Sequence, residues 1–300
     1  GSMTNGLRIG IDIGGSKIAA VILDKGGREL ASHRDETPHE YEAAIKKITN
    51  AVVQLEQQVD RAEHIGISMP GVFSADRKPL LVANLPWLEG KPFLRDLELI
   101  FGRKIKIGND ANCFALSEAI DGAASGAEVV FGVTLGTGVG SGIVVNGRVI
   151  TGANGSAGEW GHNSLPWRMD SDGAENVCCC GRIGCVETWL NGAALSRDYF
   201  VVAQKPSEAK EIARLANQGD ALARKAIARY ESRLARALSA AINFLDPNVI
   251  VLGGGLSKVS SFYERVPQLW SHHVTSGAKT TRLVAAVHGP DSGARGAAWL

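Results

Sequence analysis

Residues 7–23 read LRIGIDIGGSKIAAVIL, and residues 129–145 read VVFGVTLGTGVGSGIVV. Each segment is an apolar run, a glycine-rich turn that carries a hydroxyl residue, and a second apolar run. This pattern predicts two strands joined by a tight turn. Because the unit occurs twice, far apart in the chain, it predicts a duplicated fold in which each half contributes one glycine-rich turn.

Glycine-rich turns of this kind expose backbone N–H groups that can bind phosphate. Asp12 ends the first predicted strand, where a carboxylate can hold Mg²⁺ directly or through water. Either turn alone is more often an ordinary hairpin, and neither is a GxxxxGK[ST] loop or a strand-to-helix GxGxxG. As a pair they favour phosphate binding. The candidate residues are Gly14, Gly15, Ser16 and Lys17 in the first turn and Gly136, Thr137, Gly138 and Gly140 in the second.

The segments around these turns predict an α/β fold. Apolar residues at helical spacing predict helices over 40–58 and 220–245, and short apolar runs predict further strands. The order strand, strand, strand, helix, strand in the first half is that of ribonuclease-H-like domains. The further strands are expected at 30–33, 64–69, 105–107 and 249–252.

Two polar or glycine-rich segments follow predicted strands and are candidate ligand sites. Asp110, after Asn109, is predicted to be a helix N-cap. Its carboxylate could also accept a proton from a sugar hydroxyl that attacks a phosphoryl group. Gly253, Gly254 and Gly255 lack side chains, so an adenine ring could lie against their backbone.

Residues 158–187 hold four of the five cysteines. Cys178, Cys180 and Cys185, with His162, form a Cys₃His set that suits a closed tetrahedral zinc site of structural type. Chance clustering or disulfides are the alternative. Cys179 is interpreted as a bystander.

Two glutamates flank the predicted metal ligands. Glu159 lies one helical turn before His162, and Glu187 follows the last cysteine. A histidine bound to metal through one ring nitrogen keeps the other for hydrogen bonding. Three fixed polar groups around one point suit a small polyhydroxylated ligand, so we hypothesise a sugar site.

The amino-acid composition and net charge disfavour some classes of function. The chain has 300 residues, 45% hydrophobic and 21% charged, with a formal net charge of +1. This charge gives no electrostatic footprint for nucleic acid or anionic membrane. The sequence shows no signal peptide and no apolar run of membrane length, so a cytoplasmic location with reduced thiols is expected.

Taken together, these motifs resemble the ROK family of bacterial sugar kinases over essentially the whole chain. Ser16 stands where the family usually has Thr. The resemblance implies two ribonuclease-H-like lobes of the actin-like ATPase/hexokinase type around a central cleft: residues 1–119, and residues 120–289, with a helix at about 290–300 packing back on the first lobe. It implies ATP and Mg²⁺ as cofactors, a structural Zn²⁺, a sugar substrate and a homodimer. The residues it assigns are Asp110 as catalytic base and Gly71, Asn84, Asn109, Asp110, Glu159, His162 and Glu187 as sugar contacts.

Within the family, the phrases NLPWLEG, ANCFALSEA and GEWGHNSLPW resemble the fructokinase (mannofructokinase) branch. The N-acetylglucosamine kinase branch shares the long insert between His162 and Cys178, and the phrase ANCFALSEA fits that branch equally well. The tryptophan-containing phrases favour phosphorylation of fructose, and of mannose, at the 6-hydroxyl. N-acetylglucosamine kinase and glucokinase activities are the alternatives.

Other classes of function stay open at this point. A sugar sensor without phosphoryl transfer would keep the pocket, but the intact Asp110 and both turns argue against it. A glycoside hydrolase that uses Glu159 and Glu187 as its carboxylate pair would leave the turns unexplained. A zinc-ribbon nucleic-acid binder fits the neutral charge poorly.

Overall fold

The computed structural model describes residues 4–73, 79–81, 85–275 and 280–300. It contains two five-stranded sheets and a two-stranded ribbon. The first sheet has the order β3–β2–β1–β4–β7, with β1 (Arg8–Ile13), β2 (Lys17–Leu23), β3 (Glu29–Glu36), β4 (His64–Met69) and β7 (Ile105–Asn109). The second has the order β10–β9–β8–β11–β12, with β8 (Val129–Leu135), β9 (Val139–Val145), β10 (Arg148–Val149), β11 (Val249–Gly253) and β12 (Arg282–Ala285). The ribbon pairs β5 (Val72–Phe73) with β6 (Pro79–Leu81).

The two large sheets repeat one plan. In each, an antiparallel hairpin, β1–β2 or β8–β9, is extended by two parallel strands, β4 and β7 or β11 and β12. The glycine-rich turns predicted from the sequence join the strands of these hairpins. The predicted α/β fold with two related halves is therefore confirmed.

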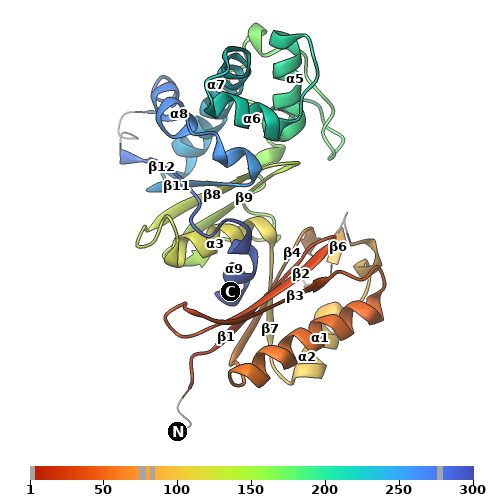
Figure 1. Cartoon of the computed structure of the whole chain (residues 1–300). Helices are drawn as coiled ribbons and strands as arrows, with labels where there is room; N and C mark the ends of the chain where they lie inside the picture. Colours follow the sequence, from red (N-terminus) through yellow and green to blue (C-terminus); the bar gives the residue numbers. More distant parts are fainter. Residues whose placement is uncertain (1–3, 74–78, 82–84, 276–279) are drawn as a thin grey trace.

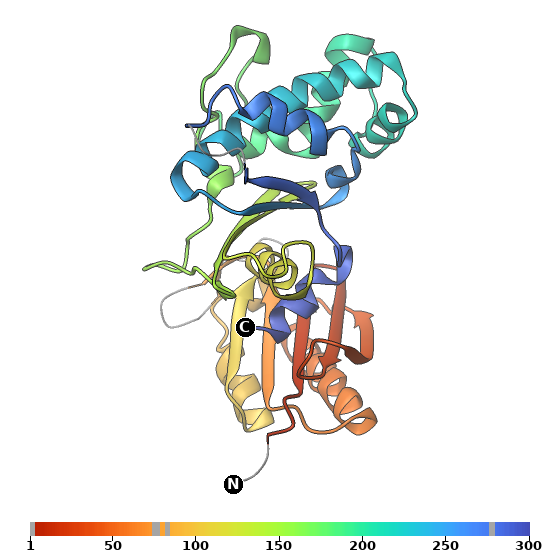
Figure 2. The same ribbon diagram turned by 90° about the vertical axis from the view of Figure 1, so that its left-hand side faces the viewer.

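The helices form layers around the sheets (Figures 1 and 2). α1 and α2 cover the outer face of the first sheet, α3 and α9 lie between the two sheets, and α4 to α8 cover the far side of the second. The helices are α1 (Tyr41–Gln58), α2 (Phe93–Phe101), α3 (Asp110–Asp121), α4 (Val186–Leu190), α5 (Gly192–Ala203), α6 (Ala209–Asn217), α7 (Ala221–Leu245), α8 (Phe262–Trp270) and α9 (Ser292–Ala298). Short 3₁₀ turns are η1 (Pro86–Leu88), η2 (Trp160–His162), η3 (Asp170–Asp172), η4 (Gly255–Lys258) and η6 (Gly289–Asp291).

The C-terminal helix α9 lies against the first sheet, although in the chain it follows β12 of the second sheet. Three glycines allow the close approach. A Cβ atom on Gly10 would lie 1.8 Å from the carbonyl oxygen of Ala294, and one on Gly66 would lie 1.7 Å from that of Ala297. On the other side of α9, a Cβ on Gly296 would lie 1.8 Å from the carbonyl oxygen of Cys113 in α3. Backbones in direct contact therefore join the first sheet to α3 through α9.

α3 packs mainly on the second sheet. Its buried Phe114, Ala115 and Leu116 form one core cluster with Val130 of β8 and Val251 of β11. The segment that begins at the catalytic candidate Asp110 thus connects the first sheet to the core of the second. The lobe boundary at residue 119 stays a prediction.

The insert between His162 and Cys178 is held to the long helix α7 by a buried ion pair. The guanidinium of Arg236 binds both carboxylate oxygens of Asp172, and both side chains are almost fully buried. The two hydrogen bonds to Asp172 help to offset the cost of burying the charges. No helix in the described part of the chain is long and apolar enough to cross a membrane.

Candidate active site

Two carboxylates lie where strands of the first sheet end, and the surrounding protein partly desolvates both. Asp12 belongs to the end of β1, and Asp110 begins α3 directly after β7. Burial raises the pKa of Asp12 to about 6, the neighbouring Ser68 hydroxyl opposes that rise, and the nearby charge of Asp110 adds to it. Burial likewise raises the pKa of Asp110. Carboxyl groups with raised pKa values beside a cleft are candidates for proton transfer.

The helix cap at this point is Asn109, so the N-cap predicted for Asp110 was wrong. Asn109 has extended backbone geometry, and its Oδ1 accepts the N–H of Asn112 at 2.8 Å. Asp110 is the first helical residue, and its Oδ1 accepts the N–H of Ala111 at 2.9 Å. Because Asn109 satisfies the helix end, the other oxygen of Asp110 is left for the cleft.

A polar cleft of about 450 Å³ brings many of the predicted residues together. The first sheet contributes the segment after β4 and the β7–α3 junction, and the second contributes the β8–β9 turn. The predicted residues that line it are Gly71, Asn109, Asp110, Gly136, Thr137, Gly138, Gly140, Glu159, His162, Glu187 and Gly254. Thr134, Ser141, Gly158 and Gly161 also line it and were missed, because nothing in their local sequence sets them apart from strand and turn residues.

The first glycine-rich turn does not line this cleft. Gly14, Gly15, Ser16 and Lys17 form the β1–β2 turn, where the N–H of Gly14 donates to the carbonyl of Lys17 at 2.9 Å. Thr37, which the sequence did not single out, steadies it: its hydroxyl donates to Gly14 at 2.7 Å. Gly253 and Gly255 are also absent from the lining, and Asn84 lies outside the described residues.

The second turn is tied to the cysteine-rich segment through Glu187. Its Oε1 accepts the N–H of Val139 at 3.0 Å, so part of this carboxylate holds the turn in place. Gly254 completes the wall with a φ of +81°, and a Cβ there would lie 2.3 Å from the carbonyl oxygen of Leu135. Only glycine meets both requirements.

The predicted metal ligands converge. One ligand atom each from His162, Cys178, Cys180 and Cys185 lie within 4.8 Å of one another. The sulfurs of Cys180 and Cys185 are 3.6 Å apart, and that of Cys178 is 3.5 Å from Nδ1 of His162. A tetrahedral site with Zn–S bonds of about 2.3 Å needs separations of about 3.8 Å, so the cluster fits zinc.

His162 connects this cluster to the cleft. Its Nδ1 faces the cysteines, while its Nε2 lies 4.0 Å from a carboxylate oxygen of Glu159. This orientation agrees with the interpretation of one nitrogen as a ligand and the other as a cleft contact. Cys179, interpreted from the sequence as a bystander, contacts a cleft residue: its thiol donates to Oε2 of Glu187 at 3.2 Å. That carboxylate raises the pKa of the Cys179 thiol to about 12.

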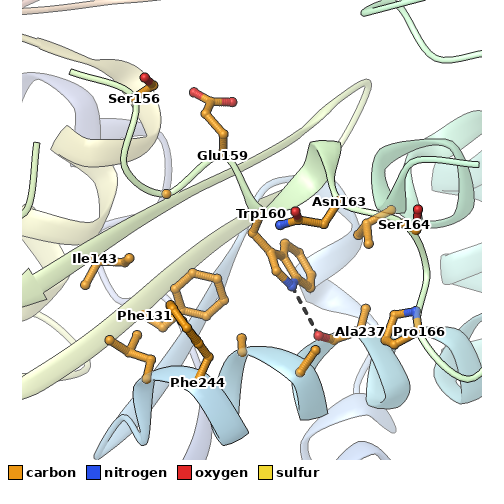
Figure 3. Close-up of a pocket in the computed structure, with 15 residues that line it drawn as sticks. Phe131, Ile143, Ser156, Glu159, Trp160, Asn163, Ser164, Pro166, Ala237 and Phe244 are labelled. Carbon is orange, nitrogen blue, oxygen red and sulfur yellow. Dashed lines mark hydrogen bonds between the residues drawn. The ribbon is translucent and has the colours of Figure 1, made fainter. Parts of the chain in front are cut away.

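Behind Glu159 the chain is fixed by Trp160 (Figure 3). The indole N–H of Trp160 donates to the carbonyl of Ala237 in α7 at 3.1 Å, and its ring packs edge-on against Phe131 at 5.7 Å. These contacts anchor the short η2 turn, which carries Glu159 at its start and His162 at its end. An apolar pocket lies on this side, and it shares Gly158 and Glu159 with the polar cleft.

The fold and the cleft define a class: two-lobed α/β kinases of the actin-like ATPase/hexokinase type. Comparison with known proteins supports this class. The model of the ROK family matches residues 8–300. An N-acetyl-D-glucosamine kinase from Citrobacter koseri is 38% identical over 296 residues, which is 97% of this chain and 98% of that protein. One from Vibrio atlanticus is also 38% identical, with the same coverage.

Solved structures give the same result. A ROK hexokinase from Thermus thermophilus superposes with a TM-score of 0.85 at 32% identity, covering 98% of this chain and 97% of that one. A ROK family glucokinase from Streptomyces griseus, in complex with glucose and AMPPNP, has a TM-score of 0.75 at 29% identity, covering 97% and 98%. The chain belongs to the ROK family. It is an ATP-dependent sugar kinase, as predicted.

Proposed function

We propose that this kinase transfers the γ-phosphoryl group of ATP to the 6-hydroxyl of N-acetylglucosamine, with Mg²⁺ as the nucleotide's partner. The observation that carries the choice of sugar is the set of relatives named N-acetyl-D-glucosamine kinase, which align over almost their whole length. Fructose, the first choice from the sequence, is unconfirmed.

Asp110 is proposed as the general base. Its carboxylate lines the cleft, and its raised pKa favours uptake of a proton. The sugar oxygen bonds to the γ-phosphorus, the bond from phosphorus to the ADP oxygen breaks, and the hydroxyl proton passes to Asp110. Asn109, with its side chain committed to the α3 cap, holds Asp110 in place.

The sugar is proposed to lie between Asp110 and the polar groups of the η2–α4 region. Glu159, His162 and Glu187 line the same cleft and are acceptors or donors for hydroxyl groups. Gly71 supplies backbone from the first lobe. Asn84, as a further contact, stays a prediction from the resemblance.

The phosphate groups are proposed to bind along the glycine turns. The β8–β9 turn lines the cleft directly, while the β1–β2 turn with Lys17 would approach from the first sheet. Asp12, beside Asp110, is the candidate holder of Mg²⁺, directly or through water. Gly253, Gly254 and Gly255 are the candidate adenosine contacts, and of these Gly254 lines the cleft.

Zinc is proposed as a structural ion in the Cys₃His cluster, where it would fix the ring of His162. The test is metal content measured on purified Cys180→Ser, with Cys179→Ser as the neighbouring control. We expect the first variant to lose the ion and the second to keep it. Equal zinc content in both would contradict the ligand set.

The substrate is tested by ADP release from Mg-ATP with N-acetylglucosamine, fructose, mannose, glucose and N-acetylmannosamine. We expect the highest kcat/KM with N-acetylglucosamine, and none with Asp110→Asn. A higher value with fructose would restore the first choice. Silence with every sugar would favour a sensor, and release of sugar from a glycoside without ATP would favour a hydrolase. The homodimer and cytoplasmic location stay predictions.

A further inference from the structure

A groove of about 790 Å³ lies at the edge of the molecule opposite to the polar cleft. The cleft is at the carboxyl ends of β1, β4 and β7, whereas this groove is at the beginnings of the same strands. The β9–β10 hairpin of the second sheet forms its far wall, and the end of α9 forms its floor. Both sheets therefore contribute to it. Its charged lining residues are Arg8, Glu63, Arg103, Lys104, Lys106 and Arg148, and His64 also lines it.

Several of these basic side chains share one face of the first sheet. A Cβ on Gly66 of β4 would meet Ala297 of α9, so this position faces α9. Side chains alternate along a strand, so His64 faces the same way. Lys106 pairs with Gly66 and Arg8 pairs with His64, which places both on this face. Lys104, two residues before Lys106, follows the same row.

Among the described residues, few groups offset the positive charge of these basic side chains. The side chains of Lys104, Lys106 and Arg148 are exposed and form no ion pair there, and Arg8 contacts only a carbonyl oxygen and the ring of Trp299. Arg103 is paired with Glu56 at 2.6 Å.

One acidic side chain, that of Glu63, lines the groove. Its Oε1 accepts the N–H of Gly6 at 3.2 Å, and it forms no ion pair with the described cations. Four unpaired cations against this one carboxylate leave a net positive charge. Like charges on neighbouring strands destabilise a sheet.

We propose that this groove is a second ligand site, which binds a small phosphate ester. Its volume falls in the range of small-molecule sites, about 300–1,000 Å³. Lysine ammonium groups bind phosphate as point charges, and arginine can bind it through two N–H groups. The ligand would bridge Lys104 and Lys106 of the first sheet and Arg148 of the second.

The test measures binding without turnover, so it does not depend on which sugar the enzyme phosphorylates. Inorganic phosphate, N-acetylglucosamine 6-phosphate and ADP are titrated by calorimetry into the wild-type protein and Lys104→Gln/Lys106→Gln. The control is Lys46→Gln/Lys225→Gln, which removes the same charge from exposed lysines on α1 and α7. Turnover at saturating substrates shows that each variant is folded.

For at least one phosphate compound, we expect a binding event that weakens at least tenfold in Lys104→Gln/Lys106→Gln and is unchanged in the control. The compound that shows it separates free phosphate, sugar phosphate and nucleotide as the source. If both variants bind all three compounds as tightly as the wild-type protein does, the proposal is overturned, because every anion would then bind only in the polar cleft. Equal weakening in both variants would also overturn it, because only net charge would matter.

Discussion

Replacing Asp12 with asparagine should stabilise the protein near neutral pH while it lowers kinase activity. Asp12 is surrounded by the first sheet and α9, where a Cβ on Gly293 would lie 2.6 Å from its Oδ2. This burial raises its pKa from 3.8 to about 6. An asparagine of the same shape carries no charge to bury, and the neighbouring Ser68 hydroxyl can accept its N–H.

The magnitude follows from the pKa shift. Between pH 3.8 and about 6 the folded protein binds more protons at Asp12 than the unfolded chain, so stability falls as the pH rises through this window. A shift of about two units is worth ~3 kcal/mol at most. The difference in unfolding free energy between Asp12→Asn and wild type should therefore grow by up to about 3 kcal/mol from pH 4 to pH 7.5.

Urea denaturation followed by tryptophan fluorescence, without Mg²⁺ or nucleotide, measures this difference at each pH. Asp35→Asn is the control. The hydrogen bond from Lys47 lowers the pKa of that carboxyl below 3.8, so the corresponding difference should stay nearly constant above this pH. A difference between Asp12→Asn and wild type that does not change with pH would refute the reasoning. It would mean that Asp12 is ionised in the folded protein as readily as in the unfolded chain.

Three further outcomes are expected. Asp110→Asn should lower kcat by about 10²–10⁴-fold with sugar binding retained, as calorimetry would show, because the base is lost and its shape is kept; an active variant would contradict the assignment. Gly66→Ala should lower the free energy of unfolding by about 3 kcal/mol or more, because its Cβ would lie 1.7 Å from a backbone oxygen of α9. The control Gly26→Ala, whose Cβ would lie 3.5 Å from its nearest neighbour, should change the urea midpoint little. The rate of ADP release should fall as the pH drops through about 6, where Asp12 becomes protonated, and the raised pKa of Asp110 acts in the same direction. A flat profile from pH 5 to 8 would count against the role of Asp12.

Much of the fold was predictable because its decisive elements are local. The hairpins around residues 7–23 and 129–145 and the periodic helices α1 and α7 carry their patterns within one short segment each. α2, α5 and β12 were not identified, whereas the last helix, Ser292–Ala298, falls within the predicted range of 290–300. The sequence also did not distinguish the glycines of turns from Gly10 and Gly66. These two lie within strands, where the missing side chain allows close contact with α9, a helix far later in the chain.

The candidate site was predicted in part for a similar reason. The cluster of His162 with three cysteines is compact in sequence, and the structure brings it together. The link from Glu187 to Val139 joins distant segments and has no local signal. The tryptophan-containing segments favoured fructose, but in the structure two of these tryptophans make packing contacts: Trp160 is anchored to α7, and Trp167 stacks on His273. Neither ring lines the polar cleft, so neither is placed to contact a sugar bound there.

The position of α9 has a consequence for biosynthesis. During translation, β1 and β4 leave the ribosome early, but the helix that covers their inner face is made only after the strands of the second sheet. Until residues 292–298 emerge, the flat strip around Gly10 and Gly66 has no partner, and the first sheet cannot complete its packing. The inner strands of the second sheet and its helices bury a core of their own and can begin to pack before α9 is made, although the edge strand β12 precedes α9 by only a few residues. The nascent chain therefore carries an unfinished first half through most of its synthesis, which is the period in which a chaperone would have a surface to hold.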